Sequence, residues 1–216
     1  MATAFVLAFA LFPVYAGVLT SAIDEPACCT LPETDSSTTQ TAISEQKALL
    51  TVLSADAHEL KDAFNADKAP AKVMLIVSPR CPACRAGATV VQKEALAEVD
   101  SDNLKVYVVW INRYPRDSRA AAEEAMTLVP DKRAQHFWDG SGAIGKQYGQ
   151  VVQLPGGKKF AWDVYFVFGP NAKWGDTPPT PAYWMHQLGG PETGNLLDGE
   201  KFREAIAKQL PKREKP

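Results

Sequence analysis

Two cysteines separated by two residues, Cys81-Pro82-Ala83-Cys84, closely follow an apolar run, Val73 to Val77. Such a run predicts a buried β-strand, and Pro82 suits the first turn of a helix because its missing N–H would have no partner there. We therefore expect Cys81 at the start of a helix, where unpaired N–H groups and the helix dipole stabilise a thiolate. Arg80 adds positive charge beside Cys81, which also favours the thiolate. The spacing is typical of a redox or metal-binding site, and its place between a strand and a helix favours redox chemistry.

Length and composition limit the other possibilities. The 216 residues suit one globular domain with an N-terminal extension. A net charge of -2, with no basic stripe, gives no indication of nucleic-acid binding. Four cysteines form two pairs, Cys28-Cys29 and Cys81 with Cys84, which are too few for a disulfide scaffold and suit a dedicated site.

The N-terminal part differs from the rest in composition. Residues 1–23 are predicted to be a signal peptide or an N-terminal membrane anchor, because Ala4 to Ile23 contains no charged residue. Residues 24–42 are rich in Pro, Ser, Thr and acidic residues and predict a flexible linker. Residues 43–210 would then be the folded domain, and 211–216 a basic tail. This organisation predicts export, with the domain periplasmic or anchored in the membrane and facing the periplasm.

Hydrophobic periodicity predicts helices that alternate with strands. The expected helices cover residues 43–65 (with a break near 54–56), 82–99, 117–128, 143–148 and 198–210, and the expected strands cover 73–77, 104–111, 135–138, 162–168 and 186–188. A tight turn at 169–172 should lead into an antiparallel strand. Together these elements indicate an α/β fold, in which a right-handed β-α-β crossover puts the cysteine motif at the carboxyl end of a central strand.

Over residues 45–210 this order of elements resembles the thioredoxin-like superfamily. It is most similar to the exported branch that includes membrane-anchored reductases of cytochrome c maturation. The matching segments are the strand with its Cys-Pro-Ala-Cys motif, Phe137 to Gly149, and Val164 to Ala172. The resemblance implies a thioredoxin-like α/β fold: a central mixed β-sheet of four or five strands flanked by helices, with the cysteines at a helix N-terminus.

Three positions depart from the pattern of that family. Arg80 stands where the family usually has Trp, and Leu75 stands where thioredoxin itself carries a buried acid. Ala161-Trp162 occupies the place where a cis-proline normally begins the strand that faces the cysteines. In the family that proline limits metal binding and helps to hold substrate peptides. The residues therefore argue against a standard thioredoxin.

Thiol–disulfide exchange is the chemistry that the motif favours. Cys81 would attack a disulfide as a thiolate, and Cys84 would resolve the mixed disulfide. Arg80 and Pro82 are expected to support the thiolate. Trp162-Asp163 begins the strand that should face the motif, and Asp163 is there either a proton acceptor or a solvated strand-end residue. We predict no cofactor; the partners would be protein disulfides or dithiols and a redox partner in the membrane, and no nucleic acid.

The alternative function is soft-metal binding or delivery, for Cu or Hg. A carrier of this kind would use Cys81, Cys84 and a distal His, for which His186 is the best candidate. The adjacent pair Cys28-Cys29 leaves several roles open: a soft-metal ligand, a disulfide with another chain, a lipid attachment point, or none.

Overall fold

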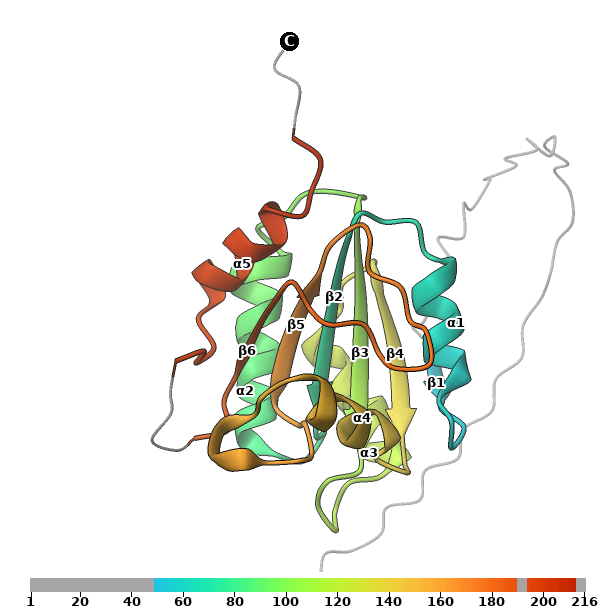
Figure 1. Cartoon of the computed structure of the whole chain (residues 1–216). Helices are drawn as coiled ribbons and strands as arrows, with labels where there is room; N and C mark the ends of the chain where they lie inside the picture. The colour runs from blue at the N-terminus through green and yellow to red at the C-terminus, as the bar shows by residue number, and fades with distance from the viewer. Residues whose placement is uncertain (1–48, 190–193, 213–216) are drawn as a thin grey trace, which may run out of the picture. The chain divides into compact units, whose positions relative to one another are not determined.

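The computed structural model describes residues 49–189 and 194–212 of the chain. Six strands form one sheet in the spatial order β1-β4-β3-β2-β5-β6 (Figure 1). They are β1 (Leu50–Val52), β2 (Ala71–Val77), β3 (Leu104–Ile111), β4 (Ala134–Asp139), β5 (Val164–Phe168) and β6 (Tyr183–His186). Strands β1 to β4 run parallel, whereas β5 runs antiparallel to β2 and β6 antiparallel to β5. The predicted N-terminal segment and linker lie outside the described residues, and the proposed domain boundaries remain predictions.

Helices cover both faces of this sheet. The described part contains α1 (His58–Ala66), α2 (Pro82–Val90), α3 (Arg119–Ala125), α4 (Ala143–Val151) and α5 (Gly199–Ala207). Side chains of β2 alternate between the faces: Val73, Leu75 and Val77 lie in one apolar cluster with α2, α3 and α5, whereas Met74 and Ile76 lie in the other with α1 and α4. All seven residues of β2 are buried, as expected for a strand covered on both sides.

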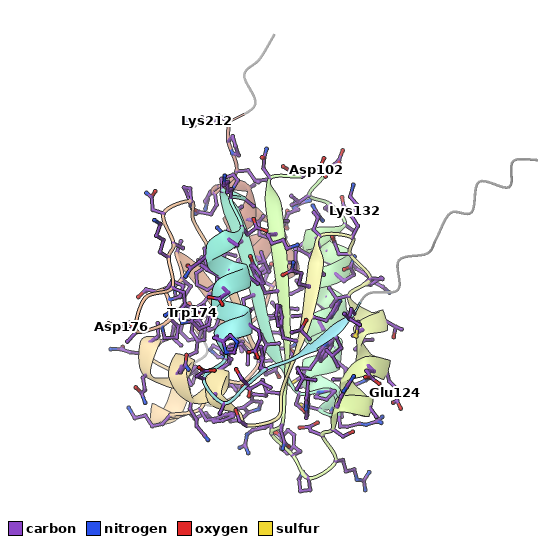
Figure 2. All side chains as sticks on the ribbon, turned by 90° about the vertical axis from the view of Figure 1, so that its right-hand side faces the viewer. Asp102, Glu124, Lys132, Trp174, Asp176 and Lys212 are labelled. Atoms are coloured by element: carbon purple, nitrogen blue, oxygen red, sulfur yellow. The ribbon has the colours of Figure 1, made fainter. Side chains whose placement is uncertain are left out.

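The strands also define two ends of the molecule. Asp102 and Lys132, which precede β3 and β4, lie together at one end, with 3.5 Å between the Lys132 ammonium and the Asp102 carboxylate (Figure 2). The carboxyl ends of β2 and β3 lie at the other end, because the two strands pair in parallel. The Cys-Pro-Ala-Cys motif follows β2 and therefore lies at that second end.

The α/β fold predicted from the sequence is confirmed. The structure has a central mixed sheet flanked by helices, and its elements follow the order strand, motif, helix and parallel strand, with an antiparallel pair later in the chain. The predicted strand at 104–111 matches β3, and Asp198 caps α5 as expected, with its carboxylate accepting from the Lys201 N–H at 3.0 Å. The helix predicted from Pro82 is α2 followed by a π-helical segment, η1 (Val91–Leu96).

Three expectations about the elements were wrong. Within the helical pattern predicted for 43–65, residues Leu50–Val52 form the strand β1 by pairing with β4, and only the later apolar positions Leu60 and Phe64 belong to α1. Strand pairing here overrides a spacing that also fits a helix. The last strand is β6 at Tyr183–His186 rather than 186–188, and a long connection separates it from the turn at 169–172. The sheet has six strands rather than four or five.

His136 is a buried histidine within this sheet. It lies on β4, is 2% exposed, and its Nδ1 accepts a hydrogen bond from the Trp110 indole N–H at 3.3 Å. The two rings are nearly parallel, with an interplanar angle of 4°. Burial lowers the pKa of His136 from 6.5 to about 4, and a hydrogen bond with the Val129 backbone offsets only part of this effect. His136 is therefore neutral in the folded protein at neutral pH.

This histidine should make folding stability depend on pH. Between pH 6.5 and about 4 the unfolded chain binds a proton on His136 that the folded chain does not. The free energy of unfolding should therefore fall as the pH is lowered through this window, by about 3 kcal/mol from this group. Urea unfolding of the wild type and of His136→Gln, which keeps an acceptor for Trp110, measures the contribution as a difference. Equal pH slopes for the two proteins would contradict it.

Candidate active site

The motif lies at the junction that the sequence predicts. Strand β2 ends at Val77, a short turn follows, and Cys81 is the N-cap residue of α2 with extended backbone angles, φ −77° and ψ 119°. Pro82 occupies the first turn of the helix, where its missing N–H leaves no intrahelical bond unmade. The Cys81 side chain thus stands beside the free N–H groups of a helix N-terminus.

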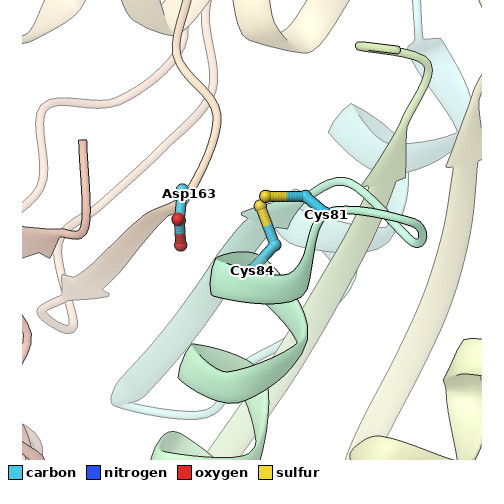
Figure 3. Close-up of side chains that lie close together, drawn as sticks. All are labelled: Cys81, Cys84 and Asp163. Carbon is cyan, nitrogen blue, oxygen red and sulfur yellow. The ribbon is translucent and has the colours of Figure 1, made fainter. Parts of the chain in front are cut away.

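The two thiols differ in exposure. Cys81 is half-buried, whereas Cys84 is fully buried, and both are free thiols. The two sulfur atoms and a carboxylate oxygen of Asp163 all lie within 4.8 Å of one another. Figure 3 shows the sulfur atoms facing each other at the top of α2, with Asp163 approaching from the neighbouring chain segment. Only Cys81 is accessible to a partner molecule.

Asp163 is a buried acid, not the solvated strand-end residue that was one expectation. It is 2% exposed, directly precedes β5, and its Oδ1 accepts from the Tyr165 hydroxyl at 2.6 Å. Its φ of 54° lies in the left-handed region, which is uncommon for a residue other than glycine. Such strained positions cluster at functional sites.

Burial sets the protonation behaviour of the site. It raises the pKa of the Cys84 thiol far above its ordinary value, and the negative charge of Asp163 raises that pKa further. Burial also raises the pKa of Asp163, and hydrogen bonds from Tyr165 and the Cys84 thiol oppose only part of that rise. The result is a buried thiol and a buried carboxyl group that share a hydrogen bond.

Gln187 and Gly87 complete the surroundings of Asp163. The surroundings of the Gln187 amide assign its orientation: with the N–H₂ group facing the acceptors, it donates to Asp163 Oδ1 at 3.1 Å and to the Ala83 carbonyl, within the motif, at 2.8 Å. The Tyr165 ring lies against α2 at Gly87, where an added Cβ would come within 2.7 Å of Tyr165 Cζ and overlap the hydroxyl. Glycine at this position therefore lets the Tyr165–Asp163 pair approach the cysteines.

A second buried carboxylate, Asp117, holds the turn before Cys81. The Ser78 hydroxyl donates to both of its oxygens at 2.9 Å, and Ser78 Oγ in turn accepts from the Cys81 N–H at 3.2 Å. Asp117 also accepts from the backbone N–H groups of Arg80 at 3.1 Å, Arg113 at 2.9 Å and Tyr114 at 2.7 Å. One carboxylate thus ties the motif turn to the loop after β3.

The other predicted site residues, Arg80, Pro82, Trp162 and His186, differ in burial and in their contacts. The Arg80 guanidinium pairs with Glu124 on α3 at 2.8 Å, and Pro82 is exposed. Trp162 is half-buried, with the Arg113 guanidinium 4.4 Å from its ring centroid. His186 is buried on β6, where its Nδ1 accepts from the Leu188 N–H at 3.1 Å. Among the described residues, the group beside the two thiols contains Asp163 rather than His186.

Sequence reasoning missed four residues of this site. Asp117 looked like the boundary of a loop, and Tyr165 like one more apolar strand position. Gln187 falls within the short strand predicted at 186–188, and Gly87 falls within the predicted helix 82–99. The one available signal was Gly87, since a glycine inside an amphipathic helix often marks a close approach by another group.

Comparison with known proteins finds similarity among solved structures alone. No family model and no curated protein matches it. Among solved structures it is similar to a secreted disulfide oxidoreductase of Mycobacterium tuberculosis that is homologous to E. coli DsbE, with 13% identity over 65% of this chain and 83% of that chain and a TM-score of 0.42. It is also similar to MTB DsbF, with 17% identity over 66% and 82% of the two chains and a TM-score of 0.42.

A third similar structure is a thioredoxin-like protein from Aeropyrum pernix, with 10% identity over 67% of this chain and 80% of that chain and a TM-score of 0.43. None of the helices in the described residues has the length and apolar character needed to span a bilayer. At identities this low, the chemistry of the chain has to be inferred from its own residues.

Proposed function

We propose that this protein is an exported thiol–disulfide oxidoreductase whose redox pair is Cys81 and Cys84. One observation carries the proposal: an accessible thiol at a helix N-terminus lies beside a buried thiol and a buried carboxylate, all within 4.8 Å. Disulfide exchange needs these three parts, namely a nucleophile that a partner can reach, a resolving thiol one turn away, and a group that accepts the proton of that second thiol.

The exchange proceeds in two balanced steps. The Cys81 thiolate attacks one sulfur of a partner disulfide; the partner S–S bond breaks, a mixed disulfide forms, and the departing partner thiolate takes a proton from water. Cys84 then loses its proton to the Asp163 carboxylate and attacks Cys81 Sγ. The Cys81–Cys84 disulfide forms, the second partner thiolate leaves, and the partner has gained two electrons from the protein. Run in reverse, the same steps oxidise a partner dithiol.

Asp163 is the group that makes the second step possible. Because burial raises the pKa of Cys84, this thiol does not ionise by itself near neutral pH. A base is most useful when its pKa approaches the working pH, and burial moves the pKa of Asp163 in that direction. The hydroxyl of Tyr165 and the amide of Gln187 hold the carboxylate in place.

The rest of the proposal concerns location and partners. Residues 1–23 would direct the chain to the periplasm, with the domain released or anchored there. The partners would be protein disulfides or dithiols together with a membrane redox protein that restores the pair, and the two thiols carry the electrons without a cofactor. The two residues between the cysteines and their surroundings set the direction of electron flow.

The first test uses full-length protein in which Cys28 and Cys29 are replaced by Ser, so that only the proposed pair reacts. This protein should reduce a disulfide-bonded peptide well above the uncatalysed rate. Cys81→Ser should fall to background, whereas Cys84→Ser should accumulate a mixed disulfide because the resolving thiol is gone. Peptide reduction and mass spectrometry measure the two results. If the intact pair does not exceed background, the proposal fails.

The second test concerns Asp163. Asp163→Asn keeps the size of the side chain but removes the base, so resolution of the mixed disulfide should slow by about tenfold or more near neutral pH. Stability supplies an independent readout. The raised pKa of Asp163 means that the folded wild type loses stability as the pH rises above the ordinary carboxyl value of 3.8, and the Asn variant should lack this loss. A variant with wild-type resolution rates would exclude Asp163 as the proton acceptor.

The same cluster favours soft-metal binding as a second candidate function. Two sulfur ligands and one carboxylate oxygen within 4.8 Å of one another suit Hg(II) or Cu(I), with thiolate ligands dominating the affinity. Here Asp163 takes the place that the sequence suggested for His186.

Metal titration of the reduced protein separates the two functions. A thiolate-to-metal absorption band that saturates at about one equivalent, and that disappears in Cys81→Ser/Cys84→Ser, would support metal binding. Both proteins carry Ser at positions 28 and 29, so that only the proposed site contributes. No saturable band in the intact pair would reject this candidate without affecting the redox proposal.

A further inference from the structure

Four arginines lie in the chain segments that follow β2 and β3, at the end of the sheet where the cysteines lie. Arg80 and Arg85 flank the motif, and Arg113 and Arg116 lie in the loop that follows β3. Three of them are exposed and Arg85 is half-buried. The two loops lie together because β2 and β3 are parallel neighbours and because Asp117 binds backbone N–H groups from both.

Arg113 packs against the ring of Trp162, the residue that directly precedes Asp163. Its guanidinium carbon lies 4.4 Å from the centroid of Trp162, and it also lies 5.2 Å from the ring of Tyr114 and 5.7 Å from that of Phe160. Trp162 directly precedes Asp163, whose carboxylate lies beside the thiols. A guanidinium that stacks on a ring keeps its edge N–H groups free to bind a carboxylate in a bidentate manner.

Of these four arginines, only Arg80 forms an ion pair among the described residues. Glu124 pairs with Arg80 at 2.8 Å, and Glu123 pairs with Arg119 at 3.0 Å. Asp117 is buried, and its oxygens accept from Ser78 and backbone N–H groups. Within residues 49–189 and 194–212, no carboxylate lies within 4.0 Å of a guanidinium nitrogen of Arg85, Arg113 or Arg116.

We propose that this surface, formed by Arg85, Arg113, Arg116 and the ring of Trp162, binds an acidic segment next to the reactive cysteine of the partner protein. The inference rests on the proposed function and names its substrate class. The whole chain has a net charge of -2, so the positive surface is a local feature of the active-site end. Local charge of this kind raises association rates with a complementary partner and disfavours basic ones.

The test compares three disulfide-bonded peptides that differ only beside the cystine, where they carry Glu, Gln or Lys. Their rates of reduction by the full-length Cys28→Ser/Cys29→Ser protein are divided by their rates with dithiothreitol, which removes their intrinsic differences in reactivity. We expect the Glu peptide to react about tenfold faster than the Lys peptide at low ionic strength, and the ratio to shrink at high salt. Arg113→Gln and Arg116→Gln should lower the ratio, whereas Arg113→Lys should keep most of it.

Lys132→Gln is the matched control. Lys132 loses the same charge, but it lies at the opposite end of the molecule, paired with Asp102 (Figure 2), and this variant should keep the full preference. A ratio near one in the wild type, with normal reduction of the Gln peptide, overturns this inference alone. Failure to reduce any peptide overturns the proposed function instead. Arg113-dependent binding of anionic lipid vesicles, with no preference among the peptides, would also overturn the inference about an acidic partner segment. It would assign the surface to membrane binding instead.

Discussion

The buried carboxylate of Asp117 is the interaction on which the arrangement of the active-site end depends. A carboxylate that leaves water needs several hydrogen bonds in return, and here the Ser78 hydroxyl and three backbone N–H groups supply them. Two of the donors belong to the turn before Cys81 and two to the loop after β3. The position of Cys81, the proposed nucleophile, and the position of Arg113 are therefore fixed by one side chain, so that loss of this carboxylate would disturb both.

The buried acid beside the thiols, Asp163, directly precedes β5 and does not lie on β2. Leu75, the β2 position at which thioredoxin itself carries a buried acid, is packed in the apolar cluster that includes residues of α2. The antiparallel pairing of β2 with β5 puts Tyr165 opposite Leu75, and Asp163, two residues earlier, then reaches the thiols from the end of the strand. Placing the acid there needs the left-handed backbone at Asp163 and the missing side chain at Gly87.

The parts of the structure that depend on local pattern could be predicted from the sequence. The strand before the motif, the helix after it and strand β3 follow from apolar runs and from the position of Pro82, and the Asp198 cap follows from side-chain chemistry next to a helical pattern. The surroundings of the thiols could not be predicted in the same way. Asp163, Tyr165 and Gln187 reach Cys84 only through the pairing of β2, β5 and β6, and Asp117 reaches Ser78 across the β2–β3 pair. The helix predicted over the residues of β1 was wrong for a related reason. These residues pair with β4, and that pairing outweighs a local spacing that also fits a helix.

Asp163 has a further consequence for how this protein can change over time. Its left-handed backbone costs about 1 kcal/mol relative to glycine, and burial of its carboxylate near neutral pH adds to that cost. A glycine there would relieve both costs and remove the proposed proton acceptor. Selection for a more stable fold and selection for the proposed disulfide exchange would therefore act in opposite directions on this single codon, and a lineage that kept the fold for binding alone would be free to lose the aspartate while keeping both cysteines.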